Sequence, residues 1–262
     1  MRGRAGRGAW RAAVALLLTL ALTRCASTPP GPPAAAPISP DQAVELARRW
    51  AAEWESFPGM RAAIELTVKN RRGSDRAAAL LLMAPTALRV EVATPFGVPA
   101  LVATAGPDDI TIFRVLERRA QTGHASAAAV GRWLGVALPP PTLIRLLVGN
   151  VPPPADPTMI AVEEKPSPHL TWIASGVRHR AWVTAEGRPA RLLLEAAEGG
   201  GGDRLAADFE WSLGGGLAVV RLEAPQQGAE LTVRYLSAEY TQSPPEAFRL
   251  VLPPDIPVQR LD

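Results

Sequence analysis

Apolar and polar residues alternate along most of the chain between residues 64 and 239. The alternation is clearest at residues 64–68 and 88–92, where every second residue is Ile, Leu or Val. Such a period places the apolar side chains on one face of a β-strand. Short turns, such as residues 71–75, separate the segments, so we expect an antiparallel sheet with one apolar face. Further strands are predicted at residues 77–83, 100–104, 110–116, 159–164, 169–174, 177–184, 190–197, 204–212, 217–224, 229–239 and 248–252.

A helix is predicted ahead of the first strand. Ser39 is a typical N-cap, Pro40 suits the first helical position, and Gln42 completes a capping box. Apolar residues then recur at helical spacing over residues 44–54. The sequence Phe57-Pro58-Gly59 ends the predicted helix.

Two more helical segments interrupt the strands in mid-chain, at residues 126–134 and 142–148, with a proline-rich link between them. The second segment is too apolar for an exposed helix, so we expect the pair to cover an open apolar surface. The chain therefore predicts one strongly curved sheet, or half-open barrel, closed by helices. The interior is either filled by the protein's own side chains or encloses an apolar ligand cavity.

The N-terminus reads as a secretory leader, with four arginines in the first eleven residues and an apolar run over residues 12–23. The run is too short to span a bilayer as a stable helix. Leu22-Thr23-Arg24-Cys25 resembles the lipobox of bacterial lipoproteins, in which the cysteine becomes the acylated first residue. Arg24 departs from that pattern, which has Gly, Ala or Ser there. Ordinary cleavage, for instance behind Ser27, is the alternative and would remove the cysteine.

We therefore divide the chain into a leader (1–24), a lipidated N-terminus with a Pro/Ala-rich tether (25–38), and one domain (39–262). The tether favours polyproline II and could reach about 40 Å. Cys25 is the only cysteine of the chain, so no disulfide is expected. The leader holds five of the 28 basic residues, which leaves 23 against 25 acidic ones. This balance removes the main support for nucleic-acid binding.

Catalytic chemistry finds little support in the sequence. His124, His169 and His179 lack metal-ligand spacing, and neither a Gly-x-Ser-x-Gly nor a His-Glu-x-x-His motif is present. The pairs Asp108-Asp109 and Glu163-Glu164 are adjacent, so in a strand their carboxylates would point to opposite faces. We expect no enzyme activity, no metal and no cofactor.

Two stretches of the chain resemble the LolB family of outer-membrane lipoprotein receptors, which has the LolA/LolB lipoprotein-carrier fold. The first is the strand end and turn Ala93-Thr94-Pro95-Phe96-Gly97. The second runs from Gly131 to Pro139 and continues as Leu143–Gly149, matching a short helix, a turn with Leu-Pro, and a second apolar helix that ends in Gly. The order of segments over residues 40–262 also fits, including a closing strand at Phe248–Pro253.

The resemblance implies a half-open antiparallel barrel of about eleven strands with an N-terminal helix and a mid-chain helical lid. Its cavity would accept acyl chains of lipoproteins from a LolA-like periplasmic carrier and release them into the inner leaflet of the outer membrane. The turn Pro95-Phe96-Gly97 would be the exposed loop that contacts the membrane, although tucked-in packing of Phe96 is the alternative. The residues we place around the cavity are Val90, Val92, Leu101, Ile112, Trp133, Leu134, Leu143, Leu146, Leu147, Trp172 and Trp182.

The sequence thus predicts a monomeric lipoprotein, anchored through Cys25 on the periplasmic face of the outer membrane, that moves acyl chains without covalent chemistry. A soluble periplasmic or secreted protein is the alternative location. The rival function is an envelope scaffold or assembly lipoprotein, which would use the same sheet as a protein-docking surface and have a filled interior. For each cavity residue taken separately, the sequence favours simple core packing over a lining role. The helical pair laid across an open sheet favours the lining role for the group.

Overall fold

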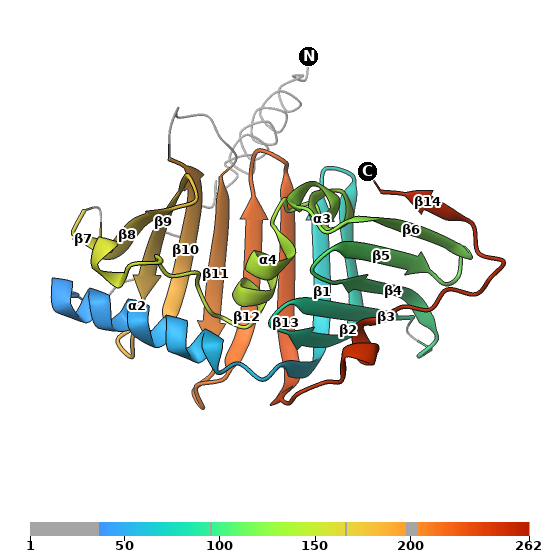
Figure 1. Cartoon of the computed structure of the whole chain (residues 1–262), viewed down its shortest axis with the longest axis horizontal. Coiled ribbons are helices and arrows are strands. Elements are labelled where there is room, and N and C mark those ends of the chain that lie inside the picture. Colours follow the sequence, from blue (N-terminus) through green and yellow to red (C-terminus); the bar gives the residue numbers. More distant parts are fainter. Residues whose placement is uncertain (1–36, 95, 166, 198–203, 262) are drawn as a thin grey trace, which may run out of the picture. The chain divides into compact units, whose positions relative to one another are not determined.

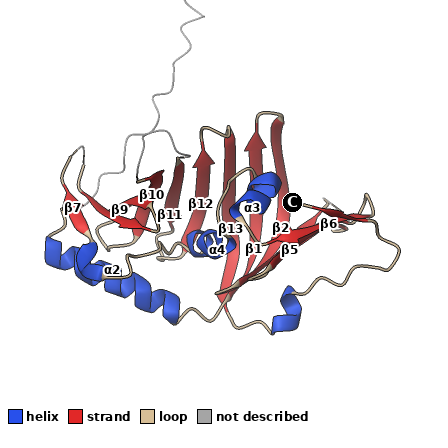
Figure 2. Ribbon diagram, turned by 45° about the horizontal axis from the view of Figure 1, so that its top comes forward, coloured by secondary structure: helices blue, strands red, loops and turns tan. Residues whose placement is uncertain are grey.

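The computed structural model describes residues 37–94, 96–165, 167–197 and 204–261. Within them, a single sheet of fourteen strands curves around the helices (Figure 1 and Figure 2). The strand order is β14-β6-β5-β4-β3-β2-β1-β13-β12-β11-β10-β9-β8-β7, and β14 alone pairs in parallel, with β6. Strands β7 and β14 form the two edges, so the sheet is open.

The first half of the sheet comprises β1 (Met60–Asn70), β2 (Gly73–Ala84), β3 (Ala87–Ala93), β4 (Pro99–Ala105), β5 (Asp109–Arg114) and β6 (Arg119–His124). The second half follows the mid-chain helices and comprises β7 (Ala161–Glu163), β8 (His169–Ala174), β9 (Val177–Val183), β10 (Pro189–Ala196), β11 (Leu205–Trp211), β12 (Leu217–Ala224), β13 (Ala229–Tyr240) and β14 (Val258–Arg260). Strands β1 and β13 join the halves, with Leu66 opposite Val233.

The predicted half-open curved sheet with an N-terminal helix and mid-chain helices is confirmed, although it has fourteen described strands and not about eleven. The prediction of a strand at residues 248–252 is wrong. A 3₁₀ helix, η2 (Pro245–Phe248), and an irregular segment at residues 249–257, which we call the strap, occupy this part of the chain. The Arg89 guanidinium holds the strap by donating to the carbonyls of Ala247 and Arg249, both at 3.2 Å. Strand β6 was not predicted, because its sequence, RAQTGH, lacks the alternation of apolar and polar residues.

Helix α2 (Pro40–Glu55) begins as the sequence predicts. The Ser39 hydroxyl accepts from the backbone N–H of Gln42 at 3.3 Å, and the Gln42 side chain accepts from the Ser39 N–H at 2.8 Å. This reciprocal pair satisfies two of the donors that a helix start leaves open. The helix buries Ala43, Ala47 and Trp50 against the sheet. It covers the ends of β8–β11 that lie at the bottom of Figure 1.

The main core lies between the concave face of the sheet and the helices. Helix α4 (Pro140–Leu147) is its most buried helix, since Leu143, Ile144, Leu146 and Leu147 are all at most 4% exposed. Figure 2 shows α3 (Ala127–Leu134) and α4 lying across the middle of the curved sheet. The lid predicted from the apolar character of residues 142–148 is therefore present, and it covers β1, β13 and their neighbours.

Charged residues cover much of the convex face of the sheet in cross-strand pairs. Glu65 on β1 pairs with Arg76 on one neighbouring strand and, at 3.8 Å, with Arg234 on the other. Glu195 on β10 likewise pairs with Arg180 at 3.1 Å and Arg204 at 3.5 Å. Half-exposed pairs of this kind contribute only about 0–1 kcal/mol each. They keep this face soluble and make the concave face the one that buries apolar surface.

We predict that Leu146→Ala lowers the free energy of unfolding by about 2–5 kcal/mol, because the fully buried side chain would leave a cavity between α4 and the sheet. The matched control is Leu213→Ala in the turn between β11 and β12, where the side chain is fully exposed. This control should stay within about 0.5 kcal/mol of the wild type. Urea unfolding followed by tryptophan fluorescence measures both, and equal losses would contradict the packing described for α4.

Candidate functional site

The mid-chain helical lid consists of α3, the link at residues 135–139, and α4. The Ser126 hydroxyl caps α3 by accepting from the Ala129 N–H at 3.1 Å. Gly135 ends α3 with a positive φ of 79°. A Cβ at this position would lie 2.8 Å from the Ala229 Cβ on β13, so glycine is required both by the backbone and by the close approach.

Three contacts anchor the C-terminal end of α4. The Tyr235 hydroxyl on β13 donates to the Leu147 carbonyl at the last helical residue. The Arg145 guanidinium lies 4.5 Å from the centre of the Trp54 ring on α2, a cation–π contact. Asn150, just beyond α4, donates from its side chain to the Trp50 carbonyl at 2.9 Å. Burial lowers the pKa of Arg145 and raises that of Tyr235, and both groups keep their ordinary charge at neutral pH.

The space beneath this lid is almost filled in the structure. A void of about 20 Å³ remains between α3, α4 and strands β1–β3 and β13. A void of this size can hold a water molecule but not an acyl chain, so it binds no lipid as it stands. Five residues predicted from the sequence line it, namely Val90, Trp133, Leu134, Leu143 and Leu147. The lining residues that were not predicted are Ile64, Leu66, Leu81, Leu88, Leu231 and Val233.

The remaining predicted residues lie elsewhere. Val92, Leu101, Leu146 and Trp172 belong to the main core or pack against it, outside the void. Ile112 lines a separate pocket of about 280 Å³, which it shares with Trp133. Trp182 packs with Leu193 and Ala206 in a second apolar cluster, whereas its neighbour Ala181 belongs to the main core. Strand alternation thus turns Trp182 away from the space beneath the lid.

A larger apolar pocket, of about 550 Å³, opens beside the lid on the concave face. The link between the helices forms one wall through Leu138, Pro139 and Thr142. Strands β8–β12 form the other wall. We call this space the concave pocket. Its volume falls within the range of about 300–1,000 Å³ that is typical of small-molecule sites. The strand residues that line it include Ala174, Val177, His179, Leu194, Leu205 and Ala224.

Sequence reasoning missed the concave pocket. Leu194 and Leu205 come from strands predicted correctly, and their alternation already placed them on an apolar face. The alternation does not reveal which strands the link of the lid faces, because Leu138 is 56 residues before Leu194 and 67 before Leu205 in sequence. Only the three-dimensional arrangement brings the link and β8–β12 together.

His179 is the one titratable side chain buried in the wall of the concave pocket among the described residues. Its ring stacks on Trp172 with centres 5.0 Å apart and planes 12° apart. Burial lowers its pKa below the ordinary value, and the nearby Val177 carbonyl, 3.1 Å from Nδ1, opposes this shift. The imidazole is therefore neutral at neutral pH, and the charged residues that line the pocket are Glu195 and Arg204, which pair with each other at 3.5 Å.

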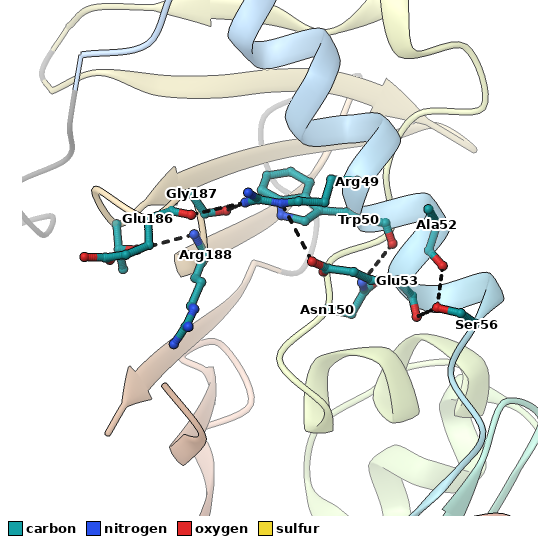
Figure 3. Close-up of polar contacts among 10 residues, drawn as sticks. Arg49, Trp50, Ala52, Glu53, Ser56, Asn150, Glu186, Gly187 and Arg188 are labelled. Atoms are coloured by element: carbon teal, nitrogen blue, oxygen red, sulfur yellow. Dashed lines mark hydrogen bonds and ion pairs between the residues drawn. The ribbon is translucent and has the colours of Figure 1, made fainter. Parts of the chain in front are cut away.

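A second groove, of about 540 Å³, follows the C-terminal half of α2 and is mixed in character. Aromatic rings of Trp54, Phe57 and Trp211 line it together with polar groups. Figure 3 shows Arg49 reaching from α2 to the carbonyls of Glu186 and Gly187 in the turn between β9 and β10. These contacts fasten α2 to the sheet, so we assign the groove a structural role.

The turn Pro95-Phe96-Gly97 joins β3 and β4. Phe96 is 93% exposed, so the alternative of a tucked-in ring does not occur here. The backbone N–H of Thr94 donates to the Val98 carbonyl at 2.8 Å, and that of Gly97 donates to the Thr94 carbonyl at 2.9 Å. Gly97 has a positive φ of 79°, as the turn requires. Pro95 lies outside the described residues, as do the leader, Cys25 and most of the tether.

Within the described part of the chain, no cluster of three or more His, Cys, Asp or Glu residues could hold a metal ion. The histidines illustrate this. His169 lies near Glu163, at 3.3 Å, and stacks on Trp182, while His179 contacts Trp172. Among the same residues, no helix combines the length and apolar character needed to cross a bilayer.

Comparisons with known proteins support the fold. The structure is similar to a domain from Vibrio parahaemolyticus provisionally described as an outer membrane lipoprotein-sorting protein domain. That match has a TM-score of 0.51 and 15% identity, and covers 80% of this chain and 97% of the domain. A DUF1329 family protein from Desulfovibrio piger matches with a TM-score of 0.52 and 11% identity, over 81% of this chain and all of that one. No family model and no curated protein matches the sequence.

These likenesses show that the chain shares the fold of a lipoprotein-sorting domain. The fold expected from the resemblance of residues 93–97 and 131–149 is thereby supported at the level of the fold family. At such low identities they carry no residue roles.

The buried neutral state of His179 predicts a pH dependence of stability. The unfolded chain binds a proton at this residue near pH 6.5, whereas the folded chain binds it only at lower pH. The free energy of unfolding should therefore fall as the pH drops below about 6.5. His179→Phe retains the stacking on Trp172 and should lose this part of the dependence.

The measurement is chemical unfolding at pH values from about 7 to about 5, where the linkage acts. The matched control is Ile173→Phe on the exposed face of β8, which adds a ring without removing a titratable group and should leave the pH dependence of the wild type unchanged. Identical pH profiles for the wild type and His179→Phe would show that His179 is not buried as a neutral ring.

Proposed function

We propose that this protein is an outer-membrane-anchored periplasmic lipoprotein that binds acyl chains of lipoproteins or related lipids and aids their insertion into the outer membrane. The concave pocket of about 550 Å³, bounded by the helical lid, carries the proposal. The fold shared with a lipoprotein-sorting domain and the LolB-like residues at 93–97 and 131–149 support it. Anchoring through Cys25, a LolA-like donor and a monomeric state belong to the same proposal.

Acyl binding requires little besides a dry apolar space, because burial of each methylene contributes about 0.8 kcal/mol. The lid borders both the small void and the concave pocket. Leu134 and Leu143 line the small void, and Leu138 and Thr142 line the concave pocket. A displacement of the lid would therefore join the two spaces into one. The chain would enter through the concave pocket and extend beneath α3 and α4.

Transfer depends on differences in affinity and not on tight binding. The cavity must hold an acyl chain more favourably than the donor does and less favourably than the bilayer. The energy needed to displace the lid lowers the affinity of the cavity, because the apolar contacts of α4 must be broken first. A nearly filled interior thus suits a receptor that releases its cargo to a membrane.

The second candidate is an envelope scaffold that docks proteins on the same sheet. The observation that favours it is the nearly filled interior beneath the lid, where a void of only about 20 Å³ remains. A filled interior is what we expect of a scaffold. The two candidates differ in one measurable property. A scaffold takes up no acyl chain, whereas an acyl-binding protein shows saturable uptake.

We predict saturable binding of a fluorescent fatty acid by residues 34–262, the compact unit that contains the whole described core. Ala174→Phe, which places a ring in the concave pocket, should weaken this binding at least tenfold. The matched control is Ile173→Phe, because residue 173 is 58% exposed and points to the opposite face of β8. Absence of saturable uptake by the wild type would favour the scaffold.

We also predict that Phe96→Glu leaves the fold and fatty-acid binding intact but reduces delivery of a bound acyl cargo to liposomes. The exposed ring has no packing to lose, whereas a carboxylate cannot enter the bilayer interface. The expected loss is about tenfold, measured as transfer of a fluorescent lipopeptide to vesicles. Phe96→Leu serves as the control and should retain delivery. Unchanged transfer by Phe96→Glu would remove this turn from the mechanism.

A further inference from the structure

Four of the large apolar side chains that the structure exposes lie along one end of the sheet. Phe96 (93% exposed) and Val98 (50%) belong to the turn between β3 and β4. Leu116 (64%) belongs to the turn between β5 and β6, and Val258 (50%) begins β14. We call these four residues the apolar rim. In Figure 1 this end of β3–β6 lies at the right of the molecule.

Backbone pairing makes the apolar rim continuous. The Val115 N–H donates to the Ala100 carbonyl at 2.9 Å, which joins the turn after β5 to the start of β4. Arg114 pairs with Arg119 across the β5–β6 turn, and Ala120 of β6 pairs with Val258. The three segments therefore lie next to one another although they come from residues 96–98, 115–118 and 258.

Arginines accompany these apolar side chains. Arg114, Arg118 and Arg119 flank Leu116 in sequence, and Arg260 lies two residues after Val258. The acidic groups in the same segments are Glu117, 4.0 Å from Arg114, and Asp255, which pairs with Arg118. Within the described residues, four positive charges thus stand against two negative ones at this end of the sheet.

We infer that the apolar rim and its arginines contact the surface of an anionic lipid bilayer. Exposed apolar side chains surrounded by charged groups mark interaction surfaces. Here two neighbouring turns and a strand end present them side by side along one end of the sheet. A lipid interface accepts apolar side chains that protrude from turns, and anionic headgroups complement the arginines.

This inference deepens the proposed function, because it rests on a membrane as the destination of the cargo. It adds a second turn, a strand end and a headgroup preference to the contact made by Phe96. The apolar rim also lies at the end of the sheet where the pocket of about 280 Å³ brings Arg114, Arg260 and Trp133 together on the lid side. The membrane would thus meet the protein beside α3.

The test is sedimentation of residues 34–262, which lack the leader and Cys25, with vesicles of phosphatidylcholine alone or with about 30% phosphatidylglycerol. The wild type should bind the anionic vesicles more strongly, and the preference should shrink as salt is raised. Arg119→Gln should lose about fivefold in partitioning, which corresponds to about 1 kcal/mol for one arginine at such a surface. Leu116→Glu should lose at least as much.

Two matched controls belong to this experiment. Leu213→Glu alters a fully exposed leucine in the turn between β11 and β12, and Arg48→Gln removes an exposed arginine from α2. Neither should change vesicle binding. Equal binding of the wild type to neutral and anionic vesicles, no binding at all, or equal effects of the controls would overturn the inference.

Fatty-acid binding by the same variants separates this inference from the proposed function. Retained uptake with lost vesicle binding supports the apolar rim. Vesicle binding without any fatty-acid uptake by the wild type would overturn the acyl-binding proposal and leave the membrane contact standing. If Leu116→Glu misfolds, it will lose both vesicle binding and fatty-acid binding. The result for Arg119→Gln then decides whether the apolar rim binds membranes, because this substitution removes a charge and leaves the apolar side chains of the rim unchanged.

Discussion

The burial of α4 against the concave face of the sheet is the interaction on which the rest of this structure depends. An open sheet with one apolar face cannot remain exposed to water, and the leucines and isoleucine of α4 cover its middle. The link before α4 then lies against β8–β12, and Asn150 after the helix reaches α2. The position of the concave pocket and the anchoring of α2 through Asn150 both follow from this placement.

The same packing explains why the candidate site has two parts. Beneath the lid the side chains interlock and leave a void of about 20 Å³, whereas beside it the sheet extends further than the lid can cover. The uncovered region is the concave pocket. A protein that must bind and then release an apolar chain gains from such a division, because the open part admits the chain and the closed part limits the affinity.

The two faces of the sheet differ in character and in role. Ion pairs such as those of Glu65 and Glu195 keep the convex face in water, and the concave face carries the candidate binding site. The end of β3–β6 is different from both, because apolar residues stand exposed beside arginines there. In the proposed function, this end would bring the protein to the bilayer that receives its cargo.

The sequence by itself determined the local elements and the character of each face. The capping box of Ser39 and Gln42, the period-two strands and the apolar helix at residues 142–148 act over a few residues, so they can be read directly. Only the tertiary structure decided which of these faces meet. It brought Leu194 and Leu205 opposite Leu138 and placed the turns of Leu116 and Phe96 at the same end of the sheet, because pairing between distant strands leaves no periodic signal in the sequence.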